Sequence, residues 1–404
     1  MVSTAELDPR DAPSAEFIQG LSTRFPVEPE IEKFLIRKLE RRASGPFNRP
    51  DLSTICGYLT RFLTDTVTSE FEISEPRWLN GGASKLQIAF ELAWNDPQAG
   101  PSRETLVLRM EPSESLNANS RLREFELLRS FSGIVPVPPV YFLDEDGDWF
   151  PEPTLIYGFA NGITKPRSTA SGSIARLGTD FGPDLRSRLA PRFVEYLARI
   201  HTFEHEKHDF ASMDRPKSSS IESALWQFNR ARRVWEEDSG ESIPLMSVAA
   251  NWLERNLPTL DAVSVVHGDY RSGNFLFDEQ SGEITAVLDW ERGHLGDRHR
   301  DLAWTTQPTF GHFDDDGITY LVCGLIPIDE FYRQYEALSG LPVDPDRLFF
   351  YRLLNSYQLV VTNLATAYRV SRLGKSHQDV LLARLHALAP AHLSNLASML
   401  EGRI

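Results

Sequence analysis

The chain has 404 residues, of which 41% are hydrophobic and 25% charged, and its formal net charge is −15. This length suits two or three packed units, and the negative charge argues against nucleic acid as the main partner. The two cysteines are too few and too far apart for a disulfide framework or a zinc site. No apolar run approaches the roughly 20 residues that span a bilayer, and no secretory signal is recognisable, so we expect a cytoplasmic protein without a membrane partner.

The first part of the chain is predicted to be helical. Residues 1–15 are polar and form a loose lead-in, and apolar residues then recur at helical spacing over residues 28–66. We assign residues 1–75 to an N-terminal helical extension. Its expected role is packing or oligomer contact, which leaves open a homodimer formed through these helices.

A strand-rich unit follows. Apolar and polar residues alternate from Leu86 to Trp94, which predicts a half-buried strand, and residues 104–110 and 153–159 read as further strands. A helix is predicted between them over residues 120–131. We therefore expect residues 76–160 to form a small antiparallel sheet with one helix.

The rest of the chain, residues 161–404, is predicted to be mainly helical. Gly, Ser, Thr and Pro dominate the connection that opens it, at residues 162–183. The sequence predicts helices over residues 185–204, 220–237, 246–257, 345–372 and 376–402. A strand-rich lobe followed by a helical lobe, with a hairpin at their junction, gives an α+β fold.

The hairpin at this junction carries the candidate chemistry. A short apolar strand runs into Asp269, and residues 275–277 and 284–288 form the two strands of the hairpin. Because antiparallel strands place the start of one beside the end of the other, Asn274 and Asp289 should be neighbours. Mg²⁺ prefers such hard oxygen ligands. Residues that merely cap turns are the plainer alternative, but the fixed spacing favours a catalytic site.

The segment H-G-D-Y-R-S-G-N at residues 267–274 resembles the catalytic loop of a phosphotransferase family that includes aminoglycoside phosphotransferases and choline kinases, relatives of the protein kinases. The resemblance implies a protein-kinase-like two-lobe fold, with ATP and Mg²⁺ as cofactors. It implies that Asp269 is the catalytic base and that Asn274 and Asp289 are metal ligands. Arg271 matches the kinase lysine that approaches the transferred phosphate.

The stretch that follows, Asp289 to Trp304, resembles the family pattern D-W-E…G-D-P…D-L-A, with Arg298 in the proline position. Asp297 and Asp301 are expected to brace the catalytic loop by hydrogen bonds rather than to touch substrate.

The nucleotide is expected to lie under the N-terminal sheet. Gly81, Gly82 and Ser84 belong to a turn whose backbone N–H groups suit phosphate oxygens, although Gly-Gly is also an ordinary hairpin turn. By analogy with the fold, the backbone around Tyr157 and Phe159 is the hinge that bonds adenine.

The expected lysine of the second strand is replaced by Arg109, which can hold phosphate oxygens bidentately. Glu124 on the next helix is its predicted partner, and Glu126 is a rival. One branch of the family, fused to some acyl-CoA dehydrogenases, carries an L-R-R strand here. V-P-V-P-P at residues 135–139 and Y-L-A-R-I-H at 196–201 also resemble that branch.

The acceptor is predicted to be a hydroxyl group of a small molecule held by the helical lobe. A hydroxyacyl-CoA or related metabolite is favoured, and Arg230, Arg232 and Arg233 are candidate cations for it. An aminoglycoside or choline-like amine is the alternative, with acidic runs at residues 236–238 and 314–316. A non-catalytic nucleotide-binding (pseudokinase) module is the third alternative, and the filled base and metal-ligand positions argue against it.

Overall fold

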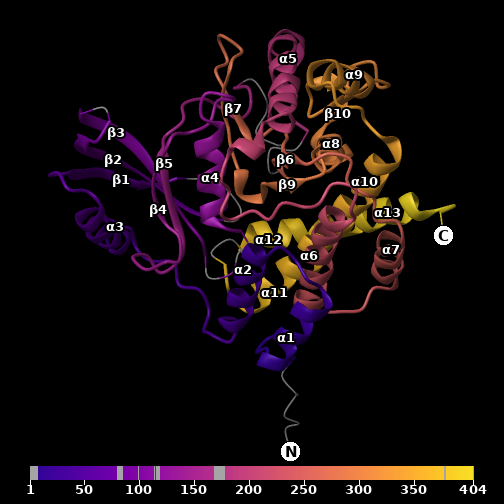
Figure 1. Cartoon of the computed structure of the whole chain (residues 1–404), viewed down its shortest axis with the longest axis horizontal. Coiled ribbons are helices and arrows are strands. Elements are labelled where there is room, and N and C mark those ends of the chain that lie inside the picture. The colour runs from indigo at the N-terminus through magenta and orange to yellow at the C-terminus, as the bar shows by residue number, and fades with distance from the viewer. Residues whose placement is uncertain are drawn as a thin grey trace, which may run out of the picture.

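The computed structural model describes residues 8–79, 85–98, 100–112, 114, 119–167, 178–376 and 379–403. A five-stranded sheet forms one lobe and a helical assembly forms the other, with short strands between them (Figure 1). The predicted α+β class is therefore confirmed. Within the described residues, no helix combines the length and the apolar character needed to cross a membrane.

The sheet of the first lobe is antiparallel throughout, in the order β1-β2-β3-β5-β4. Its strands are β1 (Glu72–Trp78), β2 (Leu86–Asp96), β3 (Gly100–Met110), β4 (Val140–Asp144) and β5 (Thr154–Gly158). β2 and β3 pair along their whole length, from Leu86 opposite Met110 to Asp96 opposite Gly100. β1 starts before the predicted boundary at residue 76, and both it and β4 were absent from the sequence-based expectation.

Helices cover both faces of this sheet. α3 (Leu52–Thr66) packs its apolar residues against the alternating apolar face of β2, as the period of two in that strand requires. α4 (Arg121–Phe131) lies on the opposite face and joins the core of the helical lobe. Ser120 caps α4 by accepting a hydrogen bond from the Arg123 N–H at 3.2 Å.

The second lobe is built from helices. They are α5 (Gly182–His201), α6 (Glu222–Asp238), α7 (Pro244–Arg255), α8 (His299–Thr305), α9 (Ile328–Ser339), α10 (Pro345–Val360), α11 (Ala367–Arg372), α12 (Asp379–Ala387) and α13 (Ala389–Leu400). The helix predicted over 345–372 is interrupted by a π-helical segment, Val361–Thr366. The one predicted over 376–402 is divided between α12 and α13. α9 and the small sheet β10 (His312–Phe313), β11 (Tyr320–Val322) and β12 (Ile326–Pro327) were not expected.

Two short antiparallel pairs lie where the lobes meet. β7 (Phe275–Phe277) pairs with β8 (Ile284–Val287), which is the predicted hairpin. β6 (Ser264–Val266) pairs with β9 (His294–Gly296). A 3₁₀ turn, η3 (Trp290–Arg292), links the two pairs and contacts α4 of the first lobe. The catalytic loop therefore starts from one pair and ends in the other.

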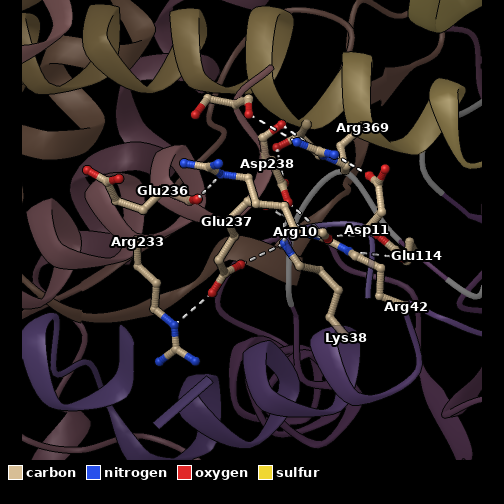
Figure 2. Close-up of polar contacts among 12 residues, drawn as sticks. Arg10, Asp11, Lys38, Arg42, Glu114, Arg233, Glu236, Glu237, Asp238 and Arg369 are labelled. Carbon is tan, nitrogen blue, oxygen red and sulfur yellow. Dashed lines mark hydrogen bonds and ion pairs between the residues drawn. The ribbon is translucent and has the colours of Figure 1, made fainter. Parts of the chain in front are cut away.

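The described N-terminal residues form an arm that is fastened to the helical lobe. We call residues 8–45 the N-terminal arm; it contains α1 (Ala15–Arg24) and α2 (Pro29–Glu40). Figure 2 shows its ion pairs with α6 and α11. Arg42 bonds Asp238 at 2.7 Å, and Lys38 bonds Glu237 at 2.8 Å. Asp8 pairs with Arg369 at 2.8 Å.

The N-terminal arm also binds the sheet lobe. Glu28 pairs with Arg123 of α4 at 3.1 Å, and both side chains are buried. Arg41 reaches Glu152 at 2.6 Å, just before β5. The arm thus bonds to both lobes of the same chain. The homodimer through these helices stays a prediction.

Candidate active site

Asp269 lies on the loop between β6 and β7, with its carboxylate anchored at one oxygen. Trp304 Nε1 donates a hydrogen bond to Asp269 Oδ1 at 2.6 Å, and Arg271 Nε donates to the same oxygen at 3.1 Å. The side chain is 19% exposed. With Oδ1 holding two donors, Oδ2 is the oxygen that can accept a proton from a substrate hydroxyl.

The loop backbone before Asp269 is held by Asp301 of α8. The Asp301 carboxylate accepts from the N–H groups of His267 at 2.6 Å and Gly268 at 2.8 Å. This confirms the predicted bracing role of Asp301. The same prediction was wrong for Asp297, which instead contacts the ring of its near neighbour His299 and Arg347 of α10.

Gly268 is required by the shape of this loop. Its φ is +83°, a conformation that side-chain-bearing residues rarely adopt. A Cβ atom at this position would come within 2.6 Å of the carbonyl oxygen of Arg292. The catalytic loop and the turn after Asp289 therefore approach each other backbone to backbone.

Asn274 and Asp289 lie together, as the hairpin predicts. The Leu288 N–H donates to the Asn274 carbonyl at 2.8 Å, and Asn274 Nδ2 donates to the Asp269 carbonyl at 2.9 Å. Asp289 has a left-handed backbone, with φ of 63°. Its side chain is 40% exposed, so its second oxygen is accessible. An amide oxygen and a carboxylate oxygen at one place suit Mg²⁺ that takes its remaining ligands from phosphates and water.

No group of three or more His, Cys, Asp or Glu side chains suited to a metal occurs in the described part of the chain. A metal at Asn274 and Asp289 would therefore depend on a bound nucleotide for further ligands.

Arg109 is the centre of a buried ionic cluster beside Asp289. It contacts Glu124 at 3.0 Å, the predicted partner, and also Asp289 at 2.8 Å and Glu291 at 2.6 Å. Burial opposes its charge, but the three carboxylates together raise the pKa of Arg109 well above its ordinary value. The contact with Asp289 was not predicted. It shows that Arg109 orients the candidate metal ligand.

Two cations of this cluster were missed by the sequence reasoning. Lys85 Nζ lies 2.8 Å from Glu111 Oε1 and 3.6 Å from Glu291, and Arg121 lies 2.9 Å from Glu111. Burial acts against the charged form of Glu291, yet Lys85, Arg109 and Arg121 lower its pKa to about 2. The strand pattern contained a usable indication, because Lys85 shares a face of the sheet with Gln87, which pairs with Arg109.

The hinge residues differ from the expectation in one respect. The Gly158 N–H donates to the Pro139 carbonyl at 2.8 Å, and the Phe159 N–H donates to Thr105 at 2.9 Å. These two amides already have partners within the sheet lobe, so they do not offer the free N–H groups expected of a hinge. The Tyr157 side chain is buried, and burial raises its pKa to about 12. Gly81, Gly82 and Ser84 lie outside the described residues.

Several acidic and basic residues proposed to bind the acceptor form ion pairs with other residues instead. Glu237 and Asp238 are fully buried in the ion pairs of the N-terminal arm, so they do not form an acidic wall. Arg233 is held by Glu32 and Glu237, and Arg232 pairs with Glu236 at 2.9 Å. The third predicted cation, Arg230, donates a hydrogen bond to Asn119 Oδ1 at 3.1 Å.

Comparison with known proteins supports a common origin for this site. The model of the phosphotransferase enzyme family (APH) matches residues 96–351, more than half of the chain. Acyl-CoA dehydrogenase family member 10 of Mus musculus is 28% identical over 282 residues, which cover 67% of this chain but 25% of that protein. The chain thus spans about a quarter of this relative.

Solved structures show the same fold. A Ralstonia eutropha protein classed among the aminoglycoside phosphotransferases aligns with a TM-score of 0.61 at 20% identity, covering 86% of this chain and 98% of that one. The GDP and kanamycin complex of APH(2")-IIia aligns with a TM-score of 0.52 at 17% identity, covering 84% and 99%. The predicted kinase-like two-lobe fold and the resemblance to the dehydrogenase-fused branch are both confirmed.

Proposed function

Because the chain belongs to the phosphotransferase enzyme family, we propose that it uses Mg·ATP to phosphorylate a hydroxyl group of a small molecule. The observation that carries this proposal is the arrangement at Asp269. Its Oδ1 is anchored by Trp304 and Arg271, and Asn274 and Asp289 lie on the hairpin that follows. Positioning and charge stabilisation are what phosphoryl transfer requires of a protein.

In the proposed reaction, the acceptor hydroxyl oxygen attacks the γ-phosphorus of ATP. Asp269 Oδ2 takes the hydroxyl proton while a P–O bond forms to the acceptor. The bond between the γ-phosphorus and its bridging oxygen breaks, and ADP leaves with that electron pair. We assign to Arg271, which bonds Asp269 Oδ1 at 3.1 Å, the role of stabilising charge on the transferred group.

Asn274 and Asp289 would hold the metal. Mg²⁺, when bound, supplies positive charge that neutralises the phosphate oxygens. The contribution of the chain is orientation, since Arg109 fixes one oxygen of Asp289 and leaves the other for the ion. The structural relative solved with GDP supports a nucleotide at this site.

For the acceptor, a hydroxyacyl-CoA or related anionic metabolite remains our preference, because the sequence relatives include acyl-CoA dehydrogenase family members. An aminoglycoside is the second candidate, supported by the relative solved with kanamycin. The burial of Glu237 and Asp238 removes one argument for a cationic acceptor. The non-catalytic module is disfavoured because Asp269, Asn274 and Asp289 are assembled.

The proposal is tested with Asp269→Asn, which keeps the shape of the side chain and removes the base. We expect turnover to fall by about 10²–10⁴-fold while Mg·ATP binding, measured by calorimetry, is retained. Glu195→Gln, on the exposed face of α5, is the control and should change neither quantity. A wild-type protein that bound no Mg·ATP and gained no thermal stability from it would contradict the proposal.

A further inference from the structure

Arg300, which is buried, and Arg292, which is half-buried, differ from the fully buried arginines that the structure describes. Among the described residues, no carboxylate oxygen lies within 4.0 Å of either guanidinium. By contrast, the fully buried arginines with carboxylate partners are Arg42, Arg121, Arg123, Arg233, Arg298 and Arg369.

The contacts of Arg292 and Arg300 are with neutral groups. The Arg292 guanidinium lies 4.5 Å from the centre of the Trp304 ring, and Arg300 Nη2 donates to Gln358 Oε1 at 2.6 Å. A third arginine, Arg230 of α6, donates to Asn119 Oδ1 at 3.1 Å. Three elements, α6, η3 and α8, thus contribute positive charge to one region.

The acidic residues beside Arg292 and Arg300 in the sequence form ion pairs or hydrogen bonds with other residues. Glu291 faces Lys85, Arg109 and Arg121, and Asp301 accepts from the catalytic-loop backbone. Asp269 is the acid whose charge acts most strongly on Arg292, and it is the residue that the bound acceptor would contact. In the part of the chain that the structure describes, neither Arg292 nor Arg300 forms an ion pair with a carboxylate.

Burial and the neighbouring positive charges lower the pKa values of Arg300 and Arg230. Burial and then the neighbouring Arg292 lower the pKa of Arg300 to about 9. Burial, Arg292 and Arg123 lower the pKa of Arg230 to about 10. Buried charge is normally paired, because an unpaired charge in a medium of low dielectric destabilises the fold. A ligand that supplies negative charge would remove this penalty.

The cluster adjoins the catalytic base. Trp304, whose ring lies beside Arg292, donates to Asp269 Oδ1, and the backbone of Arg292 closely approaches Gly268. Asp289 and the Lys85–Arg109 cluster lie on the side of the sheet lobe, whereas Arg300 and Gln358 belong to α8 and α10 of the helical lobe. Arg300 therefore belongs to the helical lobe, where the acceptor is expected to bind.

We propose that Arg292 and Arg300 bind an anionic group of the acceptor, a carboxylate or a phosphate, and so turn its hydroxyl toward Asp269. The inference rests on the proposed kinase function and narrows the acceptor to anionic hydroxyl compounds. Arginine suits both anions because its planar fork forms two parallel hydrogen bonds to them.

The first experiment measures the anion site without nucleotide. Inorganic phosphate and acetate are titrated against the full chain by thermal shift. We expect both Arg292→Gln and Arg300→Gln to weaken stabilisation by the anions at least about tenfold. The ligand-free variants should melt at the same or a higher temperature than wild type, since an unpaired buried charge is removed.

Two control variants are measured in the same experiment. Arg123→Gln breaks a buried ion pair with Glu28 and should lower the melting temperature. Arg192→Gln removes an exposed arginine of α5 and should change nothing. If Arg292→Gln and Arg300→Gln instead lowered the melting temperature and kept the anion response, the two residues would be structural and the inference would be overturned.

The second experiment uses acceptors in matched pairs, a short hydroxy acid and the diol that replaces its carboxylate with a hydroxyl. Wild type should prefer the acid, and Arg292→Gln should lose that preference mainly through KM, with Arg292→Lys restoring part of it. Equal turnover of both partners would overturn the inference. So would a loss of Mg·ATP affinity in the arginine variants with acceptor KM unchanged, because the anion would then be a nucleotide phosphate. Failure of the kinase function itself appears separately, as absent Mg·ATP binding in wild type.

Discussion

Trp304 is the residue whose role is most easily isolated. Its indole N–H donates to Asp269 Oδ1 at 2.6 Å, and the ring is buried against Arg292 and Phe310. Trp304→Phe keeps an aromatic ring and removes the donor. We expect kcat to fall about tenfold or more, since a hydrogen bond to a charged group contributes roughly 1.5–3 kcal/mol, with KM for ATP little changed. Steady-state kinetics test this, and an unchanged kcat would show that Arg271 alone positions the base.

A second prediction concerns the side chain of Arg109. Its guanidinium reaches Glu124, Asp289 and Glu291 at once, which a single ammonium group cannot do with the same geometry. Arg109→Lys should therefore leave Asp289 poorly oriented and weaken Mg·ATP binding by about tenfold. Calorimetry with and without Mg²⁺ measures the effect. A loss of equal size without Mg²⁺ would instead place Arg109 on the nucleotide phosphates.

Residues close together in the sequence could be predicted, and those joined only through space could not. Asp269, Asn274 and Asp289 share a loop and a hairpin, so strand pairing alone makes them neighbours. Trp304 meets Asp269 through the packing of α8, which no spacing in the sequence encodes. The role of Lys85 could not be predicted for the same reason, because its ion pair with Glu111 forms across the sheet, between residues that are distant in the sequence.

At the scale of elements, the N-terminal arm is held by buried ion pairs. Arg42 on the segment after α2 is fully buried and bonds both Glu114 and Asp238. Arg42→Ala leaves Glu114 without its ion-pair partner and Asp238 with Lys38 in place of two cations, and we expect the free energy of unfolding to fall by about 3–5 kcal/mol. Urea titration measures it.

The neighbouring arginine provides the control. Arg41 is 40% exposed and pairs with Glu152, so Arg41→Ala should cost only about 0–1 kcal/mol. Similar losses for both variants would mean that the burial of Arg42 does not determine its contribution.

The elements themselves were predicted unevenly. β2 was anticipated because its apolar residues alternate without interruption, whereas β1 has no buried residue and so lacked the pattern. The π-helical segment within the long C-terminal helix was also invisible, since its residues keep helical periodicity. Hydrophobic pattern identifies elements with one buried face, and edge strands and helix irregularities depend on tertiary contacts.

For the whole molecule, buried histidines predict how stability depends on pH. Burial, followed by the charge of Arg300, lowers the pKa of His294 from 6.5 to about 3. Burial also lowers the pKa of His201. The unfolded chain then binds more protons than the folded one between about pH 6.5 and 3, so stability is lost as pH falls through this range.

The test compares wild type with His294→Gln. Between about pH 8 and pH 5, the melting temperature of wild type should decrease, and that of the variant should decrease less. Glu291 contributes little in this range, because its pKa is lowered from 4.5 to about 2 and its stabilising charge is lost only below about 4.5. Parallel curves for the two proteins would contradict the prediction.

The contacts of the N-terminal arm bear on how ligands enter and leave. Glu28 binds α4 of the sheet lobe, while Lys38 and Arg42 bind α6 of the helical lobe, so one short segment joins the two lobes. Wide separation of the lobes would have to pull these charges apart in a medium of low dielectric. We therefore expect nucleotide exchange to proceed by small local movements near Asp269 and Asp289, while the N-terminal arm keeps the two lobes at a fixed separation.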